Sequence, residues 1–494
     1  MRRFESVKEN VLETSTGLLL ENSLLWPELR SALIDIVGER GCLFDSSDTE
    51  AFCEDWRLLY RGRTPVVVRP ASTAEVAAIV RLCAQKRVPL VPQGGNTSMA
   101  AGATPSVRGD EIILSLSRLN KIRELDAVDL TLTLDAGVTL QSAREAAAAE
   151  DCMLPLSMGS EGTAQIGGVV STNAGGNNTL RYGNTRDLVL GLEVVLPNGQ
   201  VWNGLRRLRK DNTGYCLRQL FVGAEGTLGV VTGAVLKLVP RPRDLAVAFC
   251  SVPSVQAALD LFVLCRQNYA DSIQAFEYLG GAVPQLVIKH FPEVRLPLSQ
   301  PADHYVLMEL AEASPDSGLR ERLEEVLGKA MEKGLVLDAA LAGSASERGA
   351  IWHLREEVSD AQKREGPTVK NDVSVPVSKI PEFITRATKA CEERFPGVRV
   401  AAFGHMGDGN IHFNLLGPLG GEEEVFKKQD HAVVDTVNEV VRQFDGSFSA
   451  EHGIGRIKSY MMEEWRGGAE LDTMRKIKAA LDPLGIMNPG KVLP

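Results

Sequence analysis

A strand, a helix and a second strand, followed at once by a glycine-rich loop, constrain the fold of this chain most. Residues 65–92 (PVVVRPASTAEVAAIVRLCAQKRVPLVP) have β-branched and apolar runs at both ends and an amphipathic pattern between them. Ser72 and Glu75 form an S-x-x-E capping box, which predicts that a helix begins after Ser72. The stretch therefore predicts a β–α–β unit that leads into the loop at 93–98.

That loop, QGGNTS, has the composition of an anion-binding site. Successive backbone N–H groups in glycine turns form a concave nest, and Thr97 and Ser98 add hydroxyl donors suited to a pyrophosphate. The loop is not a G-x-G-x-x-G segment that opens a helix, and the chain has no Gly-Lys-Ser/Thr, so a Rossmann fingerprint and a Walker A loop are excluded. Tight turns in a β-rich domain are the alternative reading.

Further elements can be placed on either side of a break at LVPRPRD, residues 238–244. Before it, Thr139 is a candidate helix cap, and DLVLGLEVVLPNGQVW reads as two strands joined by a Pro-Asn-Gly turn. After it, strands alternate with amphipathic helices such as LRERLEEVLGKAMEKG, which predicts a separate α+β domain.

Composition narrows the class of protein. A net charge of −10 argues against nucleic acid as the main partner, because phosphate binding needs a basic face. No apolar run reaches the ~20 residues of a membrane helix. The eight cysteines form no C-x-x-C pair, and the start, MRRFESVKEN, lacks an apolar segment. A reduced, cytoplasmic protein with buried thiols is therefore expected.

Five motifs, in order along the chain, carry a resemblance to known proteins. They are VPQGGNTS, GSEGTAQIGGVVSTNAGG, RYGNTRDLVLGLEVVLPNG, RKDNTGYCLRQLFVGAEGTLGVVT and LDPLGIMNPGKVLP. The chain resembles the FAD-linked oxidoreductases of the vanillyl-alcohol-oxidase type, and most of all their D-2-hydroxy-acid dehydrogenases. The resemblance implies a two-domain α+β flavoprotein: an FAD-binding domain at 1–245, a substrate or cap domain at 246–446, and a C-terminal segment at 447–494 that completes the FAD domain and the active site.

The resemblance also implies which residues bind FAD. The loop at 92–98 would hold the pyrophosphate, and later glycine-rich segments and the C-terminus would line the flavin. The implied contacts are Pro92, Gly94, Gly95, Asn96, Thr97, Ser98, Met158, Gly159, Thr163, Gly167, Gly168, Thr172, Asn173, Gly175, Glu225, Gly229, Val230 and Asn488. Asn96 stands where relatives with covalently linked flavin often carry a histidine, so FAD should be bound non-covalently.

Histidines are scarce, at seven in 494 residues, yet His405 and His412 both lie in GHMGDGNIH. Asp408-Gly409 is a two-residue hairpin signal, which would place the two histidines directly opposite each other with Cβ atoms ~5 Å apart. They could bind a divalent metal, with Glu451 completing a His₂-carboxylate set. Zinc is the expected ion and Mn²⁺ or Fe(II) the alternatives; a histidine pair on a wet face is the other reading. His452 is expected to be the general base.

Four more residues are candidates for substrate binding. The resemblance implies that Arg355, Ser359 and Lys370 contact the substrate carboxylates, with Ser359 standing in place of a threonine and keeping its hydroxyl. Arg355 and Ser359 are four apart in a helical pattern, so they are expected to share a face. Asn414, two residues after the second histidine of the hairpin, is expected on the same face as that histidine.

These observations predict the oxidation of a D-2-hydroxy acid, with D-2-hydroxyglutarate the substrate most expected. The chain has no haem or iron–sulfur pattern, so an external acceptor is expected: an electron-transfer flavoprotein, a quinone or a cytochrome. A D-lactate dehydrogenase or a glycolate oxidase flavin subunit is the first alternative. A non-catalytic flavin-binding subunit of a larger complex is the second. The oligomeric state is open, with a homodimer as one candidate.

Overall fold

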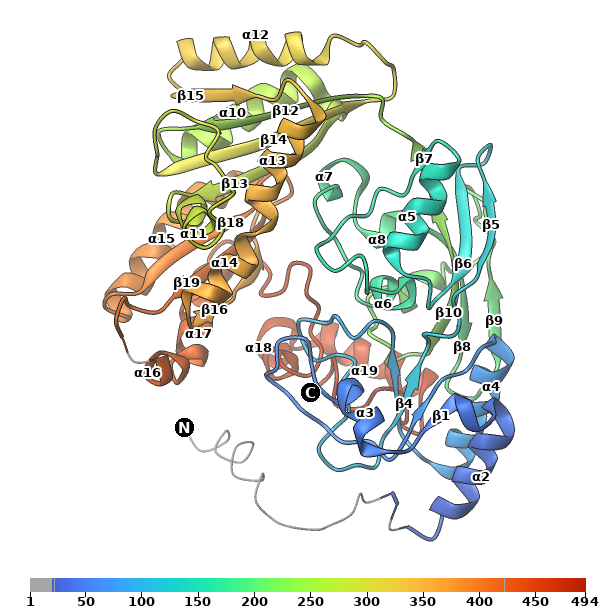
Figure 1. The fold of residues 1–494 in the computed structure, drawn as a ribbon. Helices are drawn as coiled ribbons and strands as arrows, with labels where there is room; N and C mark the ends of the chain where they lie inside the picture. Colours follow the sequence, from blue (N-terminus) through green and yellow to red (C-terminus); the bar gives the residue numbers. More distant parts are fainter. Residues whose placement is uncertain (1–19, 22, 422) are drawn as a thin grey trace.

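The computed structural model describes residues 20–21, 23–421 and 423–494, and it shows two lobes that face each other (Figure 1). The N-terminal decapeptide used to predict the cellular location lies outside the described residues. Within them, no helix combines the length and apolarity needed to cross a membrane.

The first lobe contains two main sheets. A small mixed sheet has the order β1 (Cys42–Leu43), β2 (Val67–Val68), β4 (Ile112–Ser115), β3 (Leu90–Gln93). An antiparallel sheet has the order β5 (Ile122–Asp126), β6 (Thr131–Asp135), β10 (Val230–Lys237), β8 (Val189–Val195), β9 (Val201–Gly204). A two-stranded ribbon joins β7 (Cys152–Met153) and β11 (Val239–Pro240).

Two helices of the first lobe begin where the sequence predicts. Ser72 Oγ accepts a hydrogen bond from Glu75 N at the start of α4 (Thr73–Lys86), and Thr139 caps α5 (Leu140–Ala149) in the same way. The predicted β–α–β unit, both caps and the β8–β9 hairpin are confirmed. The other helices are α2 (Trp26–Val37), α3 (Ser46–Cys53), α6 (Ile166–Ser171), α7 (Thr179–Tyr182), α8 (Thr185–Leu188) and α9 (Arg218–Phe221).

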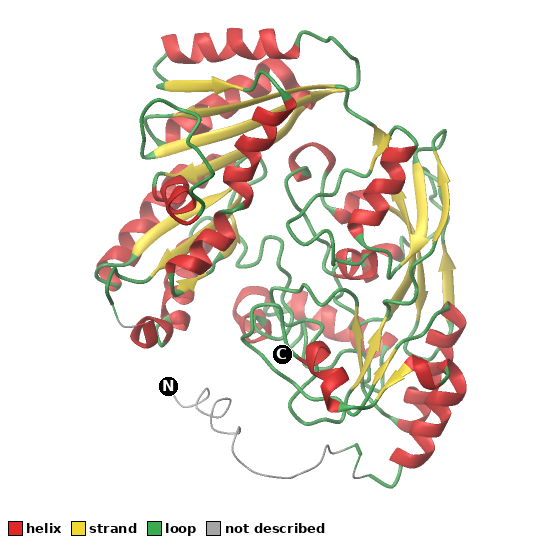
Figure 2. Cartoon of the chain, in the orientation of Figure 1, coloured by secondary structure: helices red, strands yellow, loops and turns green. Residues whose placement is uncertain are grey.

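The second lobe is built on one antiparallel sheet whose two faces are both covered by helices (Figure 2). Its strands, in spatial order, are β15 (Asp338–Leu341), β12 (Asp244–Ser251), β14 (His304–Glu312), β13 (Ile273–Gly280), β18 (Arg399–His405), β19 (Asn410–Leu416) and β16 (Thr368–Val369), with β17 (Asp372–Ser374) also paired to β19.

Alternate strand residues pack against different helices, as the period of a β-strand requires. Ala246 and Ala248 lie in one core, together with α10 (Val255–Tyr269), α12 (Leu319–Glu332), α15 (Ile380–Arg394) and α17 (Asp430–Arg442). Val247 and Phe249 lie in the other, together with α11 (Ala282–His290), α13 (Ala345–Glu356) and α14 (Val358–Glu365). The short helix α16 (Glu423–Lys427) precedes α17.

The end of the chain returns to the first lobe. After α18 (Met462–Arg466) and α19 (Ala469–Leu481), Met487 forms a parallel bridge with Leu90 of β3 and lies in the core of the first lobe. All eight cysteines are free, and seven are buried. Cys216 is exposed, so the prediction of buried thiols is wrong at that position, which lies in the open loop between β9 and α9.

Candidate active site

The histidine hairpin forms, but its register differs from the prediction. Phe403, not His405, lies opposite His412, because a four-residue turn at 406–409 replaces the two-residue turn. The carbonyl of His405 accepts hydrogen bonds from both Asp408 N and Gly409 N, at 3.2 Å each. A shift of two residues keeps a side chain on the same face of a sheet. The two imidazoles therefore still meet, with ring centroids 5.7 Å apart.

Each of these histidines has a buried carboxylate directly opposite it on a neighbouring strand. Glu277 of β13 faces His405, and its Oε1 lies 2.7 Å from Nδ1 of that ring. Asp372 of β17 faces His412, with Oδ1 3.7 Å from Nδ1. Sequence reasoning missed both acids. The available signal was a single acidic residue inside an apolar strand, which is costly to bury unless it has a partner.

The loop at 447–455 connects the two lobes through two carboxylates. Asp372 Oδ2 accepts hydrogen bonds from the backbone N–H groups of Glu451 and His452, at 3.0 and 2.9 Å. Glu225 of the first lobe accepts from Ile454 N and Gly455 N at 2.7 and 2.8 Å. The segment that carries the predicted third ligand and base is thus fixed from both sides.

Asp372, His412, Glu451 and His452 form a cluster that could hold a metal ion, each offering one ligand atom within 4.8 Å of the others. Glu451 Oε1 lies 3.6 Å from Nε2 of His412 and 3.9 Å from Nε2 of His452. His405 is outside this set, although its ring borders that of His412. The tertiary structure therefore gathers two of the three predicted ligands with the predicted base, and it adds Asp372.

Burial and these carboxylates shift the ionisation of the site. Burial lowers the pKa of His405, but the facing carboxylate of Glu277 outweighs this effect and raises it to about 9. Burial lowers the pKa of His452 to about 4 and that of His412 well below its usual range. Burial also raises the pKa of Glu451 to about 7. The ring of His452 is therefore neutral at physiological pH.

The glycine-rich loop has free donors suited to FAD. Among the described residues, none of the backbone N–H groups of 94–98 has a hydrogen-bond acceptor. A side chain at Gly95 would overlap the Thr163 carbonyl, with Cβ 1.8 Å from the oxygen, so the two glycine-rich segments touch here. A Cβ at Gly159 or Gly168 would instead enter open space. Buried Asn488 Oδ1 has no partner in the described chain. These features fit a bound dinucleotide.

Several residues implied as FAD contacts are engaged within the protein. Thr172 Oγ1 donates to Gly168 O, and Asn173 Oδ1 accepts from Arg186 N. A Cβ at Gly175 would lie 3.5 Å from Glu451 Oε2, which places the flavin-side loop next to the cluster. Three further positions also make contacts within the fold: Ser98 Oγ accepts from Ala100 N and Gly102 N, Gly229 packs on β8, and Val230 belongs to β10.

The predicted substrate residues differ in burial and in the contacts they make. Arg355 is buried, donates from Nε to Glu277 Oε2 at 2.8 Å, and stacks over Phe403. Ser359 is exposed at the start of α14, and the helix is interrupted at Glu357 between α13 and α14. Whether Arg355 and Ser359 share a face stays a prediction.

Asn414 and Lys370 differ in whether their side chains already have hydrogen-bond partners. Asn414 is buried and committed, since it accepts from Asn371 N and donates to Gln362 Oε1. Lys370 is half-buried and has no hydrogen-bond or ion-pair partner in the described part of the chain. Burial lowers the pKa of Lys370, and the charge of Arg57 from the first lobe lowers it further. Sequence reasoning missed Arg57, which no motif singles out.

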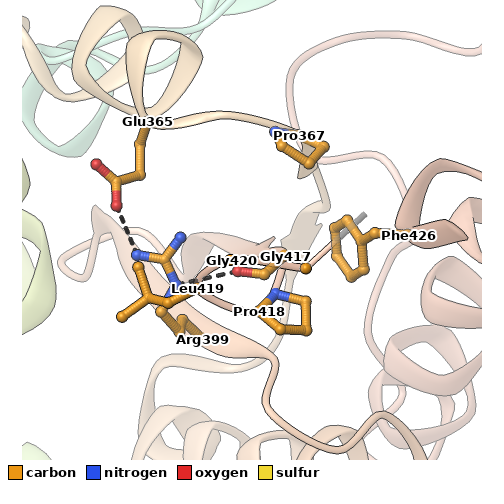
Figure 3. Close-up of a pocket in the computed structure, with 9 residues that line it drawn as sticks. Glu365, Pro367, Arg399, Gly417, Pro418, Leu419, Gly420 and Phe426 are labelled. Atoms are coloured by element: carbon orange, nitrogen blue, oxygen red, sulfur yellow. Dashed lines mark hydrogen bonds and ion pairs between the residues drawn. The ribbon is translucent and has the colours of Figure 1, made fainter. Parts of the chain in front are cut away.

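A separate pocket lies at the far end of β18 and β19, where Arg399 faces Leu416 (Figure 3). Its charged side chains, Glu365 and Arg399, are paired with each other at 2.7 Å. Because its charges are already neutralised, this pocket offers no free catalytic group.

The fold and the site define a two-domain flavoprotein, and comparisons with known proteins agree. The family model "FAD binding domain" matches residues 64–204, and "FAD linked oxidases, C-terminal domain" matches 241–492. The solved structure of p-cresol methylhydroxylase with substrate bound superposes with a TM-score of 0.73 at 15% identity, covering 94% of this chain and 96% of that chain. The resemblance to the vanillyl-alcohol-oxidase type and the predicted α+β fold class are confirmed.

Two curated relatives match over most of their length. The chain is 38% identical over 442 residues to the mitochondrial D-2-hydroxyglutarate dehydrogenase of Danio rerio, covering 89% of this chain and 80% of that protein. It is 35% identical over 450 residues to a D-2-hydroxyglutarate–pyruvate transhydrogenase of Saccharomyces cerevisiae, covering 90% and 89%. The chain belongs to the FAD-linked oxidase family and binds FAD.

Proposed function

We propose that this protein is an FAD- and divalent-metal-dependent dehydrogenase of D-2-hydroxy acids, with D-2-hydroxyglutarate as its preferred substrate. The observation that carries the proposal is the convergence of His412, Glu451 and His452 beside Gly175 of the first lobe. The names of the two curated relatives support this substrate.

His405, His412 and Glu451 are the ligands we assign to the metal. Asp372 is a poorer ligand, because its oxygens already accept hydrogen bonds from Asn410 Nδ2 and from two backbone N–H groups. The carboxylate of Glu451 lies instead 3.6 Å from Nε2 of His412 and 3.9 Å from Nε2 of His452, so it faces the imidazole nitrogens with which it would share a metal. A His₂-carboxylate set leaves positions open for substrate, as in catalytic zinc sites. Zinc is the ion we favour.

When bound, FAD supplies the hydride acceptor and the metal supplies a Lewis acid for the substrate hydroxyl. His452 takes the hydroxyl proton. Its Nδ1 lies 3.4 Å from Asp372 Oδ2, which favours the proton on Nδ1 and leaves the lone pair on Nε2. That nitrogen borders Glu451, so proton removal takes place next to the metal ligands.

Arg355 and Lys370 are the cations we assign to the two carboxylates. Arg355 is held by Glu277 through Nε, and Lys370 forms no hydrogen bond or close ion pair with a described residue, although the charge of Asp360 acts on it. A half-buried, unpaired ammonium group is stabilised by a carboxylate ligand. Ser359 is exposed at the start of α14, and the charge of the neighbouring Asp360 acts on Lys370, so Ser359 stays in the proposed substrate set. The name of a further relative, a "Putative D-lactate dehydrogenase" of Schizosaccharomyces pombe, supports D-lactate, a monocarboxylate, as the second candidate.

Turnover would require an external electron acceptor for the bound flavin: an electron-transfer flavoprotein, a quinone or a cytochrome. The yeast relative's name adds a 2-oxo acid such as pyruvate as a further candidate. A cytoplasmic location and a homodimeric state stay predictions; the word "mitochondrial" describes the fish relative.

Anaerobic mixing with a panel of D- and L-2-hydroxy acids tests the proposal. D-2-Hydroxyglutarate should bleach the flavin fastest, and L-2-hydroxy acids should leave it oxidised. A flavin that no D-2-hydroxy acid reduces would leave the non-catalytic subunit as the better reading.

A further inference from the structure

Glu277 occupies an unusual position behind the candidate site. It is completely buried in β13, the strand next to the histidine hairpin. Its Oε1 lies 2.7 Å from Nδ1 of His405, and its Oε2 accepts from Nε of Arg355 at 2.8 Å. One carboxylate therefore contacts both a proposed metal ligand and a proposed substrate cation, which lie on different elements of the lobe.

The contacts of Glu277 with His405 and Arg355 determine which polar atoms of these two side chains remain available to a ligand. With Nδ1 of His405 turned to Glu277, only Nε2 is available as a ligand atom. With Nε of Arg355 turned to the same carboxylate, the two terminal amino groups remain for a substrate carboxylate. The guanidinium carbon lies 4.8 Å from the Phe403 ring centroid, which restricts the tilt of the guanidinium.

The pairing is local in space but distant in sequence. Glu277 and His405 are directly opposed in the β13–β18 ladder, although they are 128 residues apart. Because both residues lie in paired strands, the sheet backbone itself places the Glu277 carboxylate next to the His405 ring. Arg355 reaches the same carboxylate from α13, which covers this face of the sheet.

We propose that Glu277 is a positioning residue that aligns His405 for metal binding and Arg355 for substrate binding at the same time. The inference rests on the proposed function and concerns residues that hold the metal and substrate ligands. A carboxylate is required, because a glutamine has one acceptor oxygen and its amide nitrogen would oppose either partner's N–H. An ion triad of purely structural value would stabilise the lobe without changing either ligand site.

The test uses the FAD-loaded protein, stripped of metal and titrated with Zn²⁺ in competition with a chromophoric chelator. Glu277→Gln should bind Zn²⁺ ~10–100-fold more weakly, as outer-shell partners of metal-bound histidines do. It should also raise KM for D-2-hydroxyglutarate. The matched control is Glu309→Gln. Glu309 lies in the adjacent strand β14, is partly buried, and accepts hydrogen bonds from Gln274 and Trp352. Its variant should keep wild-type Zn²⁺ affinity.

Each outcome separates the two proposals. Wild-type Zn²⁺ affinity in a folded, yellow Glu277→Gln protein overturns the positioning role and leaves the dehydrogenase proposal standing. If the wild type itself binds no Zn²⁺, the proposed metal site fails first. If Glu277→Gln does not fold, Glu277→Asp takes its place: the charge is kept, the shorter side chain cannot reach both partners, and Zn²⁺ should bind several-fold more weakly. Unchanged affinity in Glu277→Asp would again overturn the inference.

Discussion

Asp372 holds His452 by both its backbone and its ring. Oδ2 of Asp372 accepts the backbone N–H of His452 at 2.9 Å and lies 3.4 Å from Nδ1 of the same residue. Because the two residues are 80 positions apart, this contact joins a strand of the second lobe to the loop that returns to the first. The proposed base therefore has a defined orientation before any substrate binds.

Replacing this base should slow chemistry without disturbing either cofactor site. His452→Gln should keep FAD and metal but reduce the rate of flavin reduction by D-2-hydroxyglutarate ~10²–10⁴-fold, the usual loss on removing a general base. Stopped-flow absorbance under anaerobic conditions measures this rate. His353→Gln, in the half-exposed part of α13, should react like the wild type. A near-wild-type rate for His452→Gln would place the base elsewhere.

Removing a proposed ligand should remove the metal but not the flavin. His405→Ala or His412→Ala should purify without a stoichiometric divalent ion, since both residues belong to the second lobe and the glycine-rich nest to the first. Elemental analysis and the flavin absorption spectrum measure the two properties separately. Chelator should abolish wild-type turnover, and Zn²⁺ or Mn²⁺ should restore it. A fully active, metal-free wild type would contradict the assignment.

Lys370 should control selectivity between dicarboxylates and monocarboxylates. Lys370→Ala should lower kcat/KM for D-2-hydroxyglutarate far more than for D-lactate, narrowing the ratio ~10-fold or more, because a hydrogen bond to a charged group contributes ~1.5–3 kcal/mol. Lys363→Ala, an exposed lysine of α14, should leave the ratio unchanged. If the wild type already prefers D-lactate, the monocarboxylate reading replaces the dicarboxylate one.

The flavin should leave the protein on denaturation. Asn96 adopts a left-handed conformation with φ of 53°, and its amide donates to the carbonyls of Glu54 and Ala51. This side chain has no nucleophile for a covalent flavin bond. Acid precipitation should therefore give a colourless pellet and a yellow supernatant that contains FAD. Flavin retained on the washed pellet would disprove non-covalent binding.

Glu365 should stabilise the second lobe in a pH-dependent way. Burial opposes its charge, but contacts with Lys289, His290 and Arg399 prevail and lower its pKa to about 2. A depressed carboxyl pKa contributes stability that is present above the unfolded value near 4.5 and is lost as the pH falls towards 2. Glu365→Gln should lower the free energy of unfolding by ~2 kcal/mol at pH 7.

Urea unfolding of the wild type and Glu365→Gln at several pH values measures this difference. The gap between the two proteins should narrow as the pH falls below about 4.5. A gap of constant size across that range would show that packing, not charge, accounts for the loss. Glu382→Gln, an exposed partner of Arg386 in α15, should change stability by well under 1 kcal/mol at every pH.

Much of the first lobe could be predicted from local sequence. The β–α–β unit at 65–92 and the caps at Ser72 and Thr139 depend on residues within a few positions of one another. Such short-range preferences act wherever the segment lies. The glycine-rich loop at 94–98 is also a local feature. Consecutive backbone N–H groups can point in one direction without any contact to a distant residue.

The candidate site depended on contacts that local patterns do not encode. The hairpin motif identified His405 and His412, but the turn formed with four residues instead of two. The strand register therefore shifted by two residues, and because this number is even, both rings stayed on one face of the sheet. Glu277 and Asp372 became their partners because β13 and β17 pair with the hairpin strands, far from it in sequence. Arg355 likewise reached Glu277 only because α13 packs on this face of the sheet. Sheet pairing and helix packing bring together residues whose distance along the chain carries no information about their distance in space, so these relationships were decided only when the chain folded.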